Sequence, residues 1–284
     1  MRDPFISASF IRVHPPRLPL THIPTHSPPA VNPTRRQSTW NLENRFTGWV
    51  DVPLTPQGVE EARRAGAALK KEGINFDVAY SSVLRRAITT CWKVLDATDQ
   101  HFVPHLQDWR LNERHYGSLQ GLNKAETAAK HGEEKVNLWR RSYDVPPPPY
   151  DSAHPFFTGG DRRYAALPQS VLPLTESTLT CGERVVPFWE TVLKPALVSG
   201  KRLLVVAHGN SLRALVKHID GFSNDAIVKL NIPTGVPLLY EFDAAFKPIA
   251  QPGRMDGLSG RYVAEDLDAI AAEIKKVANQ SKAK

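Results

Sequence analysis

The stretch LLVVAHGNSLRALV, residues 203–216, constrains the fold of this chain more than any other. It opens with an uninterrupted apolar run at 203–206, which is typical of a strand buried on both faces of a sheet. A short polar turn with His208 and Gly209 follows and leads into a helical pattern. In open α/β folds such a turn presents free backbone N–H groups to anions at the carboxyl edge of the sheet. The stretch therefore predicts an anion site at His208, although a histidine partly buried for packing gives the same pattern.

Strand and helix patterns alternate along the rest of the chain. Strands are predicted at residues 76–80, 103–106, 203–206 and 238–242, and helices at 56–73, 83–97, 125–141, 175–192 and 266–284. This order predicts an α/β fold, a three-layer α/β/α sandwich with a mainly parallel central sheet.

The predicted helix at 83–97 has an unusual start. Ser81 or Ser82 is expected to cap it, because a serine hydroxyl accepts a hydrogen bond from a free N–H of the first turn. Arg85 and Arg86 then fall in that first turn, where the helix dipole disfavours positive charge. Either a bound anion compensates the two arginines, or they form an ordinary solvated helix start.

The first 37 residues differ from all that follow. Eight prolines lie among the first 34 residues, a density that prevents a helix or an inner strand. We therefore predict a disordered arm over residues 1–37, in which only residues 5–14 alternate like a strand. The folded domain is expected over residues 38–284, with a lid-like insertion at about 143–172 and a C-terminal helix and tail at about 266–284.

Charge and composition limit the possible partners. The net charge is +7, but lysines and arginines are scattered, which favours small anionic ligands over nucleic acid. Two cysteines form neither a disulfide framework nor a metal-binding pattern, and no apolar run is long enough to cross a membrane. We expect a cytoplasmic protein without a membrane partner. The arginine-bearing, acid-poor arm leaves organelle targeting as an alternative.

The chemistry-bearing residues indicate phosphoryl transfer. The candidates are one histidine, His208, one acid, Glu113, and several cations, among them Arg86 and Lys124. Cations neutralise phosphate oxygens, while an acid serves the hydroxyl that gives or takes a proton. The chain has neither a P-loop pattern nor a carboxylate cluster for magnesium. This set therefore favours a histidine-based reaction without a metal over a nucleotide kinase.

Seven segments resemble the cofactor-dependent phosphoglycerate mutases of the histidine phosphatase superfamily. They are STWNLENRFTGW, SSVLRRAITT, LNERHYGSLQGLNKAE, LWRR, LPLTES, AHGNSLRALVK and LNIPTGVPLLYEFD. Together they span about residues 38–242, with a looser likeness in the tail VANQSKAK. The segment LNERHYGSLQGLNKAE is similar to the mutases rather than to the wider phosphatases.

The resemblance implies a set of roles. His208 stabilises the transferring phosphoryl group, Arg86 clamps it, and Glu113 is the general acid and base. Substrate phosphate and carboxylate are held by Ser38, Asn41, Thr47, Gly48, Arg114, His115, Tyr116, Lys124, Arg140, Arg141, Gly209 and Asn210. The implied reaction interconverts 3-phosphoglycerate and 2-phosphoglycerate through a phosphohistidine, in glycolysis and gluconeogenesis. 2,3-Bisphosphoglycerate primes it, no metal takes part, and the protein is a homodimer or homotetramer.

One departure from the family concerns the nucleophile. The family has an apolar strand and Arg-His-Gly-Glu directly before this Ser-Thr-Trp-Asn, and its histidine carries the phosphoryl group. The corresponding position here is Arg35, whose guanidinium stays protonated and forms no phosphoenzyme. The preceding residues 27–33 are rich in proline, so the first central strand is expected to be replaced.

This departure leaves several hypotheses open. The abrupt start of the resemblance at Ser38 is what an alternative or mispredicted first exon produces. His14, in the strand-like part of the arm, is a substitute nucleophile only if its strand fills the central slot and brings it to the site. Beside mutase activity stand a catalytically impaired phosphoglycerate-binding protein and, less favoured by the motifs, a general phosphatase.

Overall fold

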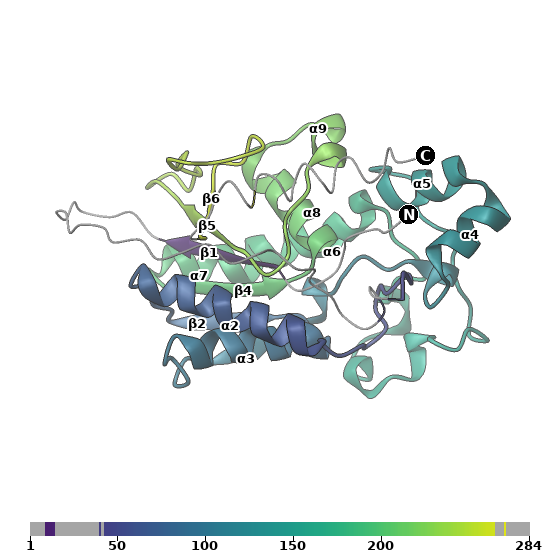
Figure 1. Cartoon of the computed structure of the whole chain (residues 1–284), viewed down its shortest axis with the longest axis horizontal. Coiled ribbons are helices and arrows are strands. Elements are labelled where there is room, and N and C mark those ends of the chain that lie inside the picture. The colour runs from purple at the N-terminus through teal and green to yellow at the C-terminus, as the bar shows by residue number, and fades with distance from the viewer. Residues whose placement is uncertain (1–8, 15–39, 41–42, 265–269, 271–284) are drawn as a thin grey trace.

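The computed structural model describes residues 9–14, 40, 43–264 and 270. Helices cover both faces of a six-stranded sheet, which gives the predicted three-layer α/β/α sandwich (Figure 1). The strands are β1 Ser9–His14, β2 Val78–Ser81, β3 His105–Gln107, β4 Leu203–Ala207, β5 Pro237–Glu241 and β6 Arg261–Tyr262. The helices are α2 Pro56–Lys71, α3 Arg85–Ala97, α4 Lys124–His131, α5 Glu133–Arg141, α6 Thr178–Phe188, α7 Lys194–Val198, α8 Gly209–Asp220 and α9 Asn224–Lys229.

The apolar run of β4 explains why two helical layers form. Leu203 and Val205 belong to the core cluster that α6 and α8 also line, while Leu204 and Val206 belong to the cluster lined by α2 and α3. Successive side chains of a strand point to opposite faces, so a continuous apolar run needs cover on both sides. The expectation of a strand buried on both faces is confirmed.

The strand order is β3-β2-β4-β1-β5-β6. The pairs β2–β3, β2–β4 and β1–β5 are parallel, whereas β1–β4 and β5–β6 are antiparallel. The sheet is thus mainly parallel, as predicted. Its carboxyl edge at β2 and β4 lies towards α4 and α5 (Figure 1).

Strand β1 corrects our view of the arm. We predicted residues 1–37 to be disordered and the first central strand to be replaced, but Ser9–His14 pairs with both β4 and β5. Without it, two inner strands would leave rows of backbone N–H and C=O groups unpaired, which is costly in a core. The alternating part of the arm satisfies these groups. The remaining arm, residues 1–8 and 15–37, lies outside the described residues.

The direction of β1 decides which end of it meets the site. It runs antiparallel to β4, with Ser9 opposite Ala207 and Val13 opposite Leu203. His14 pairs with Glu241 of β5. Five residue steps of about 3.3 Å separate Ser9 from His14, so His14 lies at the edge of the sheet away from His208.

Helix α3 begins later than predicted. Its N-terminal flanking residue is Leu84, and neither Ser81 nor Ser82 caps the helix by a side chain. Instead Asp51 Oδ1 accepts a hydrogen bond of 2.7 Å from the Arg85 N–H. The anion that compensates this arginine-bearing helix start therefore comes from the protein itself.

Two predicted helices are interrupted. The expected helix at 125–141 divides into α4 and α5 at Gly132, whose φ of +86° ends the first helix. The expected helix at 175–192 starts at α6 after the Ser177 cap and continues through a π-helical turn, Trp189–Leu193, into α7. The predicted C-terminal helix falls outside the described residues except at Ile270.

The insertion at 143–172 is packed rather than separate from the domain. Three 3-10 turns form within it, Thr158–Gly160, Arg162–Tyr164 and Gln169–Val171. Buried Tyr164 packs beside Trp49 and accepts a hydrogen bond of 2.8 Å from Asn112 Nδ2.

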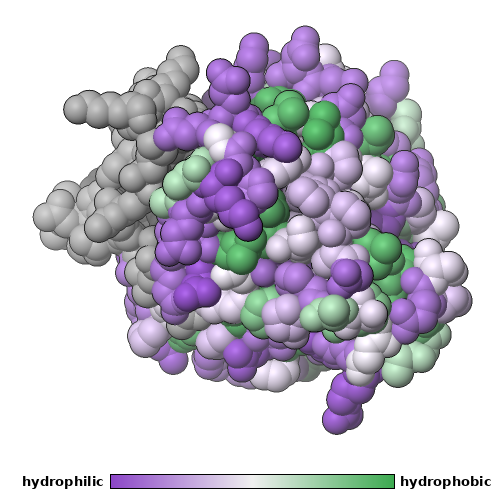
Figure 2. Space-filling view, turned by 90° about the vertical axis from the view of Figure 1, so that its right-hand side faces the viewer, coloured by the Kyte–Doolittle hydropathy of each residue, from purple (hydrophilic) through white to green (hydrophobic). Residues whose placement is uncertain are grey.

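The face of the molecule near α4 and α5 is largely hydrophilic, with hydrophobic residues in separate groups (Figure 2). In the described part of the chain, no helix combines the length and apolarity needed to cross a bilayer.

Candidate active site

His208 lies where β4 ends and α8 begins, as the sequence predicted. Its extended backbone (φ −135°, ψ 162°) makes it the N-terminal flanking residue of α8. Its Nε2 lies 2.7 Å from Ser82 Oγ, and its buried Nδ1 has no hydrogen-bond partner among the described residues. Burial, helped by Arg86 and Arg184, lowers the pKa of His208 well below its usual value. The imidazole is therefore neutral at physiological pH, which is the form that can accept a proton or a phosphoryl group.

Glu113 stands beside the same helix start. Its Oε1 accepts hydrogen bonds from the N–H groups of Arg114 (2.7 Å) and Asn210 (3.2 Å). Its Oε2 is buried and has no partner among the described residues. Burial raises the pKa of Glu113 even though Arg86 and Arg114 oppose the shift. A carboxyl group held in place with one oxygen unengaged and a raised pKa suits general acid and base chemistry.

Arg86, in the first turn of α3, is held in place by two backbone carbonyl groups. It is fully buried, and its guanidinium donates to Val50 O (2.9 Å) and Gly48 O (2.8 Å). Its Nε has no partner among the described residues. Burial lowers the pKa of Arg86 to about 10, so it remains a cation at neutral pH. The helix start of α3 thus supplies a positive charge held close to the Gly48 turn.

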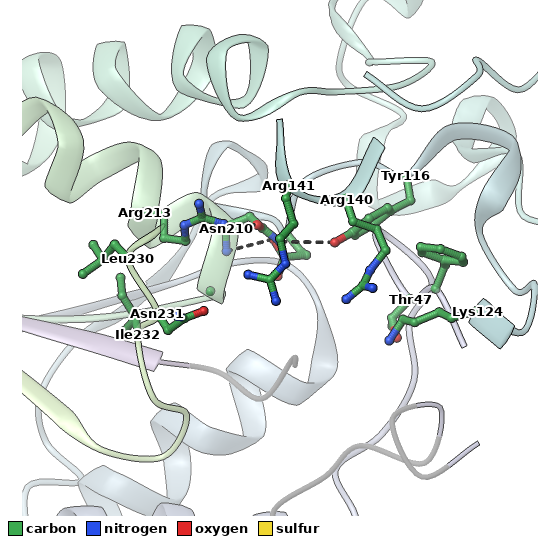
Figure 3. Close-up of a pocket in the computed structure, with 13 residues that line it drawn as sticks. Thr47, Tyr116, Lys124, Arg140, Arg141, Asn210, Arg213, Leu230, Asn231 and Ile232 are labelled. Carbon is green, nitrogen blue, oxygen red and sulfur yellow. Dashed lines mark hydrogen bonds between the residues drawn. The ribbon is translucent and has the colours of Figure 1, made fainter. Parts of the chain in front are cut away.

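A small, partly closed cavity of about 50 Å³ opens between the start of α8 and the ends of α4 and α5 (Figure 3). It collects these residues that the sequence proposed: Thr47, Glu113, Tyr116, Lys124, Arg140, Arg141, Gly209 and Asn210. His208 and Arg86 are not among its lining residues.

The cavity lining carries four cations and one carboxyl. The cations are Lys124, Arg140, Arg141 and Arg213, and the carboxyl is Glu113. Burial lowers the pKa of Lys124 to about 8 and that of Arg140 to about 10. Concentrated positive charge in a partly closed cavity attracts anions strongly, because low-dielectric walls weaken screening.

Two predicted binding residues have supporting positions instead. His115 is fully buried, donates its N–H to Glu176 Oε2 (2.7 Å) and accepts a hydrogen bond from the Gly117 N–H at Nδ1 (3.0 Å). Burial lowers the pKa of His115 to about 3, so it is neutral. Arg114 donates to Trp139 O (3.1 Å) and Arg140 O (2.9 Å). Neither lines the cavity, because both side chains are used inside the protein to hold the loop and the end of α5.

Four further residues of the prediction precede α2 in the chain. Gly48 uses its carbonyl to hold Arg86, and its φ of +51° is a conformation that favours glycine. Ser38, Asn41 and Arg35, the position of the family nucleophile, lie outside the described residues.

Several residues that the fold brings to the site had no role in the sequence prediction. Arg213 and Asn231 line the cavity, and Ser82 contacts His208. The sequence did offer a signal for Arg213. It lies three residues after Asn210 at a helix start, so the two side chains are neighbours on the helix. Asn231 lies on a segment between α9 and β5, for which the sequence offers no local signal.

Within the described residues, no group of three or more His, Cys, Asp or Glu side chains is arranged to hold a metal ion. The polar groups of the site are mainly nitrogen donors that carry positive charge, which repel cations and attract phosphate or carboxylate.

Binding of small anions at the edge of an α/β/α sandwich is the chemistry that this cation-lined cavity fits. The chain belongs to the histidine phosphatase superfamily (branch 1), whose family model matches residues 37–245.

Solved structures of other proteins share the fold. YhfR of Bacillus stearothermophilus superposes with a TM-score of 0.56 at 20% identity, covering 85% of this chain and 94% of that one. The alpha-ribazole phosphatase of Shigella flexneri gives 0.55 at 17%, covering 84% and 92%. A mycobacterial glucosyl-3-phosphoglycerate phosphatase gives 0.54 at 19%, covering 92% and 98%.

Proposed function

We propose that this protein is a phosphoglycerate mutase that interconverts 3-phosphoglycerate and 2-phosphoglycerate. The observation that carries the proposal is the cavity in which four cations surround one carboxyl of raised pKa. Phosphoglycerates carry a phosphate, a carboxylate and a hydroxyl on three adjacent carbons. Cations suit the two anionic groups, and Glu113 suits the hydroxyl that exchanges a proton during transfer.

Unpartnered polar groups in the cavity support binding of the proposed primer, 2,3-bisphosphoglycerate. Thr47 Oγ1, Arg141 Nε and Arg213 Nε are buried and have no hydrogen-bond partner among the described residues. Such groups are costly unless a ligand engages them. When bound, the primer would supply a phosphoryl group, while Lys124 and Arg141 would bind its anionic oxygens. The homo-oligomer and the cytoplasmic location expected from the resemblance belong to the same proposal.

Phosphoglycerate binding without turnover is the second candidate. It is favoured by Arg35 at the family's nucleophile position and by the direction of β1, which puts His14 opposite Glu241 rather than Ala207. The described lining of the cavity contains no histidine. The described lining therefore offers no histidine to carry a phosphoryl group to a ligand in this cavity.

One set of measurements on the full chain separates these functions. Calorimetric titration with 3-phosphoglycerate is expected to show binding, and an Arg140→Gln, Arg141→Gln variant is expected to lose at least tenfold in affinity, an effect of about 1.4 kcal/mol or more. Product analysis then tests turnover, and intact mass after exposure to 2,3-bisphosphoglycerate tests for a phosphoryl adduct. Turnover with an adduct supports the mutase, whereas binding with neither supports the second candidate. Release of inorganic phosphate from generic phosphate esters would indicate a phosphatase, and absence of binding would refute both proposals.

The affinity for 3-phosphoglycerate is expected to fall as pH rises. Lys124 has a pKa of about 8 in the free protein because it is buried. Its ammonium is charged below that pH and neutral above it, so an anion that binds the charged form loses about tenfold in affinity between pH 7 and pH 9. Titrations at several pH values check this. A Lys124→Arg variant, which stays charged, is expected to show a nearly flat profile, and equal slopes in both proteins would contradict the assignment.

A further inference from the structure

We propose that Arg213 and Asn231 form a second anion subsite, which makes the cavity selective for ligands with two anionic groups. This inference rests on the proposed function and adds a specificity determinant to it. Arg213 and Asn231 lie at one end of the cavity, and Lys124 and Thr47 lie at the other (Figure 3). Arg140 and Arg141 lie between these ends (Figure 3). Positive charge is therefore spread over the length of the cavity instead of being gathered at one point.

The surroundings of Arg213 indicate that its charge lacks a protein partner. The guanidinium donates to Asn210 Oδ1 (3.3 Å) and to the Ile227 carbonyl (2.5 Å), both of which are neutral. Among the described residues, no carboxylate forms an ion pair with Arg213, and its buried Nε has no hydrogen-bond partner. A buried charge held only by neutral groups is costly, so an anion entering here is bound strongly.

Neighbouring positive charges also favour binding of an anion beside Arg213. Burial, together with the like charges of Arg114 and Arg141, lowers the pKa of Arg213 to about 10, although Glu113 opposes the shift. Arg213 remains a cation at neutral pH, and the repulsion from its neighbours is relieved when an anion lies between them. The contacts with Asn210 and Ile227 also fix the guanidinium, so less conformational entropy is lost on binding.

Asn231 completes the subsite from another part of the chain. It lies between α9 and β5, next to Ile232, and both residues line the cavity. Its Nδ2 donates to the Lys229 carbonyl at 3.1 Å, which fixes the orientation of the amide. An amide of this kind offers a hydrogen bond to a carboxyl or phosphate group that Arg213 attracts.

The distribution of positive charge along the cavity indicates which chemical groups a ligand must carry. One end of the cavity takes the phosphate of the ligand and the Arg213 end takes a second anionic group, a carboxylate or another phosphate. Glycerol 3-phosphate is a matched probe, because it has the phosphate and the carbon skeleton of 3-phosphoglycerate but carries a neutral CH₂OH in place of the carboxylate. The subsite therefore predicts a strong preference for 3-phosphoglycerate.

Calorimetric titration of both compounds tests the inference. The wild-type chain is expected to bind 3-phosphoglycerate about tenfold to a hundredfold more tightly than glycerol 3-phosphate, as for a charge-assisted hydrogen-bonded contact. Arg213→Gln is expected to reduce this preference to about threefold or less, mainly by weakening the binding of 3-phosphoglycerate. Arg213→Lys, which keeps the charge, is expected to retain part of the preference. Arg64→Gln removes one exposed positive charge from α2 and is expected to leave the preference unchanged.

The outcomes distinguish the inference from the proposed function. If the wild-type chain binds 3-phosphoglycerate but Arg213→Gln keeps its full preference, the inference is wrong and the proposed function stands. If wild type binds neither compound, both are refuted. Because Arg213→Gln removes two internal hydrogen bonds and risks misfolding, Asn231→Ala provides a second test that leaves Arg213 in place. It is expected to lose a measurable part of the preference, and an unchanged preference in a folded Asn231→Ala variant would count against the subsite.

Discussion

Replacement of Arg184 by alanine is expected to lower the free energy of unfolding by about 3–5 kcal/mol. Arg184 forms a buried two-pronged ion pair with Glu176, with Nε–Oε1 at 2.6 Å and Nη2–Oε2 at 2.8 Å. It also donates to the carbonyl oxygens of Arg110, Asn112 and Glu113. The substitution leaves the Glu176 carboxylate buried without its cation and three carbonyls without this donor. Each of these losses is costly because water cannot replace the missing partner.

Urea denaturation followed by far-UV circular dichroism measures this loss. Arg202→Ala is the matched control, because Arg202 also forms a two-pronged pair, with Asp77, but side-chain exposures of 35% and 37% place that pair at the surface. The corresponding exposures for Arg184 and Glu176 are 7% and 2%. The control is expected to cost less than about 1 kcal/mol. Equal losses in the two variants would show that burial does not govern the Arg184 network.

The Arg184 network also bears on the site. The Glu113 carbonyl accepts hydrogen bonds from Arg184 Nη2 (2.9 Å) and from Trp49 Nε1 (2.5 Å). These two donors fix the backbone from which the Glu113 carboxyl reaches the start of α8. In the proposed function Glu113 exchanges a proton, and proton transfer needs an acid that is held in place. The same scaffold behind Glu113 would then serve both folding and chemistry.

The Ile11→Pro substitution is expected to destabilise the fold by about 3 kcal/mol or more. Ile11 lies in the middle of β1, opposite Val205 of β4 and Leu238 of β5. Proline has no N–H to donate and is not tolerated in the centre of a sheet, where both neighbours depend on regular pairing. Thermal and urea unfolding measure the loss, and native-state hydrogen exchange is expected to show reduced protection in β4.

A matched substitution makes the Ile11→Pro result specific. Ile11→Val keeps the backbone donor and strand propensity and is expected to change stability by less than about 1.5 kcal/mol. If Ile11→Pro behaved like Ile11→Val, β1 would not be a central strand, and the original expectation of an unpaired arm would be restored. The same result would reopen the question of which segment pairs with β4 and β5.

Much of the fold follows from local sequence patterns. The apolar run that becomes β4, the glycine-containing turn after it and the alternation of strands with helices predicted the sandwich. Thr55 and Pro56 likewise mark the observed start of α2, where Thr55 Oγ1 accepts from the Gly58 N–H at 3.1 Å. These signals work because they depend on residues within one or two turns of each other.

The candidate site was predictable in part. Glu113, Lys124, Arg140 and Arg141 were proposed from the sequence, and the fold brings them to one cavity. The family resemblance implied that His115 binds substrate, yet its ring is enclosed within the protein. Residue type shows what chemistry a side chain can perform, but neighbouring packing decides whether the side chain points into the cavity.

The sequence by itself determined the fold class, the strand-to-helix turn at His208 and most of the charged residues that surround the cavity. Only the tertiary structure decided that β1 runs antiparallel to β4, that Asp51 serves the start of α3, and that Arg213 joins the cavity. The physical reason is distance along the chain. Glu113 meets the Asn210 N–H across 97 residues, and no local pattern encodes a contact that forms only when separate elements pack together.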